Sequence, residues 1–117
     1  MYKIKKSTLG EARKCMEYLA ANIGNDSGAE VYEMANEAKK VMEAMRKKER
    51  VKLDALKGTK DEFSPRAIDI EDKIDIMGEV IIYIMDIITQ VKKPVPKADL
   101  ILKRAEQAAR NIAALQE

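Results

Sequence analysis

Carboxylates at helical spacing are the side chains of this chain best suited to chemistry. Glu30, Glu33 and Glu37 follow one another at steps of three and four residues, a spacing that places them on one face of a helix. A second row, farther along the chain, comprises Asp72, Asp75, Glu79 and Asp86. Two such rows on packed helices could hold Mg²⁺, which prefers oxygen ligands and keeps several waters for a phosphate substrate.

Ordinary solvated helix faces offer a simpler explanation of both rows, and we favour it. Exposed faces commonly carry acids, and acids near a helix N-terminus interact favourably with the helix dipole. The second row is nevertheless unusual, because exposed faces tend to mix charge signs at a spacing of four. Between Asp69 and Val91, six acids accompany a single base, Lys73. Metal binding therefore stays as an alternative.

Two short motifs carry a family resemblance. Residues 30–33, EVYE, have the form E-x-x-E, and residues 77–84, MGEVIIYI, join an acid to an apolar run. They resemble the motifs of the all-α nucleoside-triphosphate pyrophosphohydrolases (MazG-like), in which E-x-x-E on one helix precedes E-x-x-D and an apolar run on a second. The resemblance implies Mg²⁺ bound by Glu30, Glu33 and Glu79, and cleavage of a nucleotide between its α and β phosphates.

The sequence departs from the family pattern in the second motif. With Glu79 in the aspartate position, Ile76 stands where the family has its glutamate, and an isoleucine cannot bind metal. Asp75, alone or with Asp72, would have to substitute. The segment between the two motifs is also longer than in the family. The ligand set of this alternative is therefore Glu30, Glu33, Asp75 and Glu79.

A run of basic residues in the middle of the chain is the second candidate site. It comprises Arg46, Lys47, Lys48, Arg50 and Lys52. Such a run could bind an acidic protein partner or a phosphate backbone. No aromatic side chains interleave it to stack on bases, and Glu49 dilutes its charge. We therefore expect a solvated face or a protein partner, and we rank nucleic acid below both.

Composition excludes several other kinds of site. The chain has no His, which removes His-centred triads and His-ligated zinc. Its one Cys, Cys15, cannot form an internal disulfide and indicates a reducing compartment. We expect a buried, unreactive thiol there. The longest apolar run, Val80–Met85, is far shorter than the roughly 20 residues of a membrane span. We therefore expect a soluble, cytoplasmic chain without membrane contact.

Two capping signals mark the start of the first two helices. Thr8 with Glu11, and Ser27 with Glu30, each place an acid three residues after a hydroxyl, which is typical of a helix N-terminus. We expect the first helix over residues 8–23. The second would run some 45 Å at about 1.5 Å per residue, and we expect its second half to project past the core or to bend there.

Prolines and apolar periodicity define the rest of the chain. Ser64-Pro65 suits the start of the third helix, Asp69 offers a second starting point, and the helix is expected to occupy 69–91. Pro96 opens a fourth helix, which again shows apolar residues at steps of four and three. Residues 1–6 are basic and predict a tail or a short extended arm. Nothing in the chain reads as a strand.

The third helix is apolar over most of its girth. Its central seam, which would form the core or an oligomer contact, comprises Ile74, Met77, Ile81, Ile84 and Ile88. Other large apolar residues widen that seam, so more than one neighbouring helix must cover it. Its polar residues fall within a sector of roughly 80°, which we expect to stay free. The pattern predicts an all-α, antiparallel four-helix bundle that forms one domain, residues 1–117, and is oligomeric.

These features support two functional hypotheses and a weaker third. The leading one is a non-enzymatic helical module that acts through protein–protein contacts without a cofactor, as a homo-oligomer and as a regulator or inhibitor of a larger complex. The motive is the apolar girth of the third helix, which exceeds what one small bundle hides. The alternative is the Mg²⁺-dependent pyrophosphohydrolase. The weaker third is nucleic-acid binding through the basic run.

Overall fold

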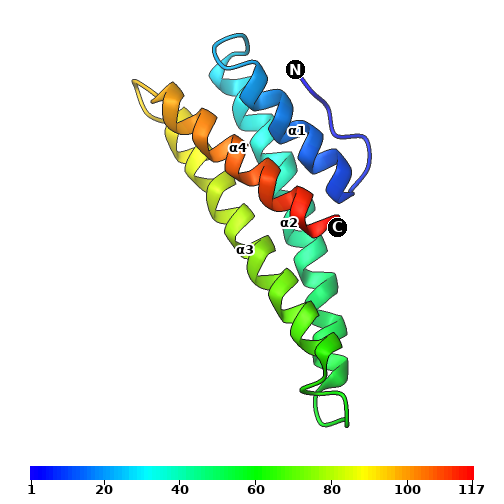
Figure 1. Cartoon of the computed structure of the whole chain (residues 1–117). Helices are drawn as coiled ribbons and strands as arrows, with labels where there is room; N and C mark the ends of the chain where they lie inside the picture. Colours follow the sequence, from blue (N-terminus) through cyan, green and yellow to red (C-terminus); the bar gives the residue numbers. More distant parts are fainter.

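The chain folds into four α-helices joined by short connections (Figure 1). The computed structural model describes all residues from 1 to 117. The helices are α1 (Leu9–Ala21), α2 (Gly28–Leu56), α3 (Pro65–Val91) and α4 (Ala98–Leu115). No strand is present, which confirms the all-α prediction. None of the four helices combines the length and the apolar content that crossing a membrane requires.

Each helix packs against two others, and the diagonal pairs stay apart. The contacting pairs are α1 with α2, α2 with α3, α3 with α4, and α4 with α1. Because the connections are short, neighbours in sequence run in opposite directions, as Figure 1 shows. The result is an up-down-up-down bundle, which confirms the predicted antiparallel arrangement.

Local side-chain hydrogen bonds explain where three of the helices begin. Ser27 and Glu30 form a full capping box at the start of α2. The Ser64 hydroxyl accepts from the Ala67 N–H at 3.2 Å, and Pro65 occupies the first turn, so α3 begins at Ser64-Pro65, the first of the two predicted starts, and not at Asp69. Thr8 likewise accepts from the N–H of Glu11 to start α1, but the Glu11 carboxylate does not return to the cap.

The core lies where all four helices overlap. It is built mainly from methionine, isoleucine and alanine, because the chain has few aromatic residues. Its largest fully buried side chains include Met16, Met42, Met77, Ile84 and Ile112. Cys15 is also buried there, and burial raises the pKa of its thiol to about 12. The predicted burial of Cys15 is thus confirmed.

The molecule is elongated because α2 and α3 extend beyond α1 and α4 (Figure 1). It measures 52 × 25 × 19 Å, with a radius of gyration of 15.5 Å, against about 13 Å for a compact domain of this length. The projecting end of the α2–α3 hairpin buries its own small group of residues, Ala67, Ile70 and Ile74, apart from the main core. The prediction that the second half of helix two projects is confirmed.

Replacing Ile84 by Ala tests the central position of α3. Ile84 has no exposed surface, so Ile84→Ala should leave a cavity and lower the free energy of unfolding by about 2–5 kcal/mol. Ile82 lies two residues away on the same helix and is 58% exposed. Ile82→Ala should change the free energy of unfolding by about 0.5 kcal/mol or less. Chemical denaturation followed by circular dichroism measures both, and equal losses would contradict this arrangement.

Candidate interaction surface

The C-terminal half of the polar face of α3 packs against α4. Glu79 accepts a hydrogen bond from Asn111 Nδ2 at 3.2 Å. Asp86 Oδ2 lies 2.8 Å from Arg104 Nε, an ion pair whose N–H is not directed well enough to count as a hydrogen bond. The Arg104 guanidinium also lies 5.5 Å from the ring centre of Tyr83. The expectation that this face stays free is wrong for its C-terminal half, because α4 offers matching polar groups.

The four carboxylates of the metal-site alternative do not converge. Glu30 caps α2 by accepting from the Ser27 N–H, Glu33 faces the N-terminal segment and Glu79 meets α4. Asp75 is exposed on α3. No group of three or more acids or cysteines in the chain is close enough to hold a metal ion.

The predicted seam of α3 is rotated towards α4 in the structure. Ile74, Met77 and Ile84 are buried as expected. Ile81 and Ile88 are only half-buried, and residues placed beside the seam, such as Val80 and Ile87, are completely buried instead. The reason is that α3 packs against α2 and α4 at once, so the centre of its buried face lies between these neighbours.

The basic run does not form one continuous patch. Successive residues of a helix point about 100° apart, so Arg46, Lys47 and Lys48 point in three directions. Lys52 pairs with Glu49 at 3.2 Å. Lys47, Lys48 and Arg50 are exposed on the projecting half of α2, and they remain the part of the run that a partner could reach.

Arg46 has a structural contact that the sequence did not reveal. Its Nε donates a hydrogen bond to the Ile74 carbonyl at 3.2 Å. Its guanidinium lies against Gly78, where an added Cβ would come within 3.0 Å of Nη2. The small residue at position 78 therefore gives Arg46 room to bridge α2 and α3. This bridge lies at the level where the hairpin leaves the bundle.

A line of residues that runs along α3 to its C-cap residue Lys92 is left uncovered by the other helices, and we call it the outer stripe. It comprises Asp75, Gly78, Ile82, Met85, Thr89 and Lys92, all of which are exposed except the half-buried Gly78. Ile82 is 58% and Met85 50% exposed at its centre. Lys92 Nζ lies 5.4 Å from the ring centre of Tyr32 on α2. Two exposed apolar side chains that adjoin on one helix face are candidates for a contact with another protein.

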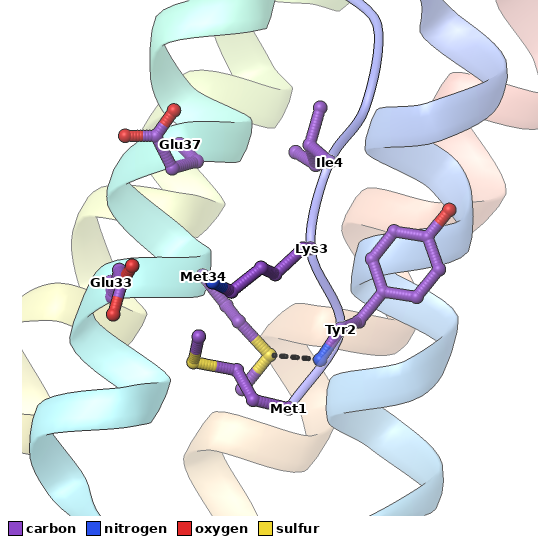
Figure 2. A pocket seen from close by; sticks show the side chains of 7 residues that line it. All are labelled: Met1, Tyr2, Lys3, Ile4, Glu33, Met34 and Glu37. Atoms are coloured by element: carbon purple, nitrogen blue, oxygen red, sulfur yellow. Dashed lines mark hydrogen bonds between the residues drawn. The ribbon is translucent and has the colours of Figure 1, made fainter.

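The N-terminal residues form an arm that is fastened to α1 and α2. Figure 2 shows the arm running between the two helices, with the Tyr2 N–H donating to Met34 Sδ at 3.4 Å. The Tyr2 hydroxyl and the Lys5 N–H donate to the two oxygens of Glu11, at 2.7 and 3.0 Å. The arm and α2 line a hollow of about 160 Å³. Residues 1–6 thus lie against α1 and α2.

These hydrogen bonds shift the pKa values of Glu11 and Tyr2 in opposite directions. The bonds from the Lys5 N–H and the Tyr2 hydroxyl favour the ionised carboxylate and lower the pKa of Glu11. The bond to Glu11 raises the pKa of Tyr2 to about 12, because the hydroxyl must keep its proton to donate. Glu11 therefore couples the position of the arm to its own ionisation.

Comparisons with known proteins give no match to this chain: no protein-family model, no curated protein and no solved structure matches it.

Glu11→Gln should weaken the fastening of the arm in a pH-dependent way. Because the folded pKa of Glu11 is lowered, its contribution to stability is present above the unfolded pKa of about 4.3. That contribution is lost as the pH falls through the folded value. The variant should be less stable than the native chain at neutral pH, and the difference should vanish in acid.

Thermal unfolding measured across pH values tests this, with Glu17→Gln as the matched control on the same helix. Glu17 pairs with Arg13 on the surface at 3.3 Å, and exposed pairs contribute little to stability. If Glu11→Gln and Glu17→Gln give the same pH profile, Glu11 does not fasten the arm.

Gly78→Ala tests whether Arg46 bridges the hairpin. An Ala inside a helix is normally about 1 kcal/mol better than Gly, but here the new Cβ would displace the Arg46 guanidinium. We expect a full gain in the free energy of unfolding only in an Arg46→Met background. The gain there should exceed that in the native background by roughly 0.5 kcal/mol or more. Denaturant unfolding of the four proteins gives this difference, and equal gains would show that Arg46 is not held at Gly78.

Proposed function

We propose that this chain is a non-enzymatic helical module that acts through protein–protein contacts made by its projecting α2–α3 hairpin. The observation that carries the proposal is a large aromatic side chain at the tip that the fold does not use. Phe63, the only Phe in the chain, is 86% exposed in the connection between α2 and α3. Val51 and Ile68, on the helices leading to the tip, are exposed as well.

The connection that carries Phe63 is held by hydrogen bonds. The Thr59 hydroxyl donates to the Leu56 carbonyl at 2.6 Å. The Glu62 N–H donates to the Thr59 carbonyl at 3.2 Å, and the Ser64 N–H donates to the Asp61 carbonyl at 3.1 Å. An aromatic ring on such a turn loses little freedom when it binds. Phe63 is thus suited to anchor the hairpin in an apolar pocket of a partner protein.

The projecting halves of α2 and α3 hold the hairpin tip at a fixed distance from the bundle. Both helices run without interruption from the bundle into the projecting half, and Arg46 bonds one to the other at the exit. The exposed cations Lys47, Lys48 and Arg50 lie along this half and would speed the approach of an acidic partner. This geometry suits a regulator or inhibitor that inserts one end into a larger complex.

A photo-crosslinking amino acid in place of Phe63 tests the proposal in cells that express the chain. We expect one or a few discrete adducts with other proteins, identified by mass spectrometry. Purified native chain should compete for these adducts, and Phe63→Ala should compete poorly. Because Phe63 is so exposed, the Ala variant should lose no more than about 0.5 kcal/mol of stability.

The matched control carries the same probe at Lys103, which is exposed on α4. Adducts that form equally at both positions reflect random collision. If the Phe63 probe gives no adduct above this control, or if Phe63→Ala competes as well as the native chain, the hairpin tip is not a binding site.

A further inference from the structure

We infer that a second copy of this chain covers the outer stripe, with the two α3 helices antiparallel about a two-fold axis. The inference deepens the proposed function, since it also treats the chain as one that acts through protein contacts. It concerns a different surface, however, because the outer stripe lies on the middle and C-terminal part of α3 and not at the hairpin tip.

The spacing of the outer stripe is the same in both directions. From Asp75 to Lys92 its members are separated by 3, 4, 3, 4 and 3 residues. An antiparallel helix reverses the order of its residues, so only a spacing of this kind lets every member of the stripe meet a member of the same stripe on an identical copy. The two-fold axis would pass midway between Ile82 and Met85.

The chemistry of the stripe matches this pairing. Ile82 of each copy would pack on Met85 of the other, so each of these apolar residues gains an apolar partner. Gly78 of one copy would meet Thr89 of the other. The Arg46 guanidinium lies against Gly78 of its own copy, and the Thr89 hydroxyl of the other copy could accept a hydrogen bond from it. Asp75 at one end would meet Lys92 at the other. Each contact then occurs twice, as a two-fold interface requires.

Charge also argues for a second copy of this chain over an unrelated helix. The stripe is acidic at its N-terminal end and basic at its C-terminal end, and it has no charge at its centre. A parallel copy would place Asp75 against Asp75 and Lys92 against Lys92, which is repulsive. The antiparallel copy replaces both repulsions with attractions. The stripe is thus complementary to itself in one orientation only.

The size of the stripe sets the expected strength. Its length from Asp75 to Lys92 is about 26 Å at 1.5 Å per residue. A single helix pair of this length buries less than the roughly 800 Å² per partner of a standard stable interface. We therefore expect a weak dimer that dissociates on dilution to low micromolar concentration.

Sedimentation velocity over a series of concentrations of the native chain should show this monomer–dimer equilibrium. Ile82→Asp should raise the dissociation constant at least about tenfold, because it places a charge at the apolar centre. The control is Ile68→Asp, a similarly exposed isoleucine of α3 that lies outside the stripe. It should leave the dissociation constant unchanged, and circular dichroism should show that both variants are as helical as the native chain.

Charge reversal tests the orientation. Asp75→Lys and Lys92→Glu should each weaken the dimer, because each creates a like-charge pair twice. The double variant should recover the native dissociation constant. An equimolar mixture of the two single variants should associate more tightly than either alone, since both end pairs of the mixed dimer have opposite charges.

Three results would overturn the inference. They are a native chain that stays monomeric up to near-millimolar concentration, an Ile82→Asp variant that dimerises like the native chain, and a double variant that does not recover. None of these results bears on the Phe63 crosslinking, which tests contacts at the hairpin tip. A monomeric chain that still gives the Phe63 adducts would refute the dimer and leave the proposed function standing.

Discussion

The coverage of α3 is the constraint on which the rest of this structure depends. Val80, Ile84 and Ile87 have no exposed surface, and a helix that is apolar over most of its girth must bury several faces at once. Helices α2 and α4 cover two sides, and α1 closes the core by packing against both of them. Because α1 and α4 are shorter than α3, this coverage ends partway along. Two parts of α3 stay accessible to other proteins, namely its N-terminal part in the projecting hairpin and the outer stripe.

Polar contacts accompany the packing of the fourth helix on α3. Glu79 meets Asn111, and Asp86 meets Arg104, which also faces the ring of Tyr83. Partly exposed pairs of this kind add little to stability, but an α4 on any other side of α3 would leave them without partners. Two acids that looked free for metal or solvent, Glu79 and Asp86, therefore contact α4. With that side occupied, the uncovered line of α3 is the one centred on Ile82 and Met85.

The molecule divides into parts with different tasks. The four-helix end supplies stability through its methionine and isoleucine core, and Glu11 fastens the N-terminal arm across α1 and α2. The hairpin carries Phe63 away from that core, and Arg46 links its two helices at the exit. The outer stripe lies on the side of the bundle itself. A chain could therefore pair with a copy through one surface and reach another protein with the other.

Local signals in the sequence were enough to determine the four helices, their short connections and the burial of Cys15. Ser27 with Glu30, and Ser64 with Pro65, start helices through contacts made within a few residues, so no knowledge of the whole fold was needed. The exposed line of α3 could not be determined in that way. Ile81, Ile82, Ile84 and Met85 are all apolar, and their period does not say which of them a neighbour will cover. The hydrogen-bond partners of Glu79 and Arg46 could not be determined from the sequence either, because Asn111 and Ile74 lie about thirty residues away from them along the chain. Only the packing of α4 and α2 on α3 decided these contacts, since a side chain's environment depends on which helices lie beside it.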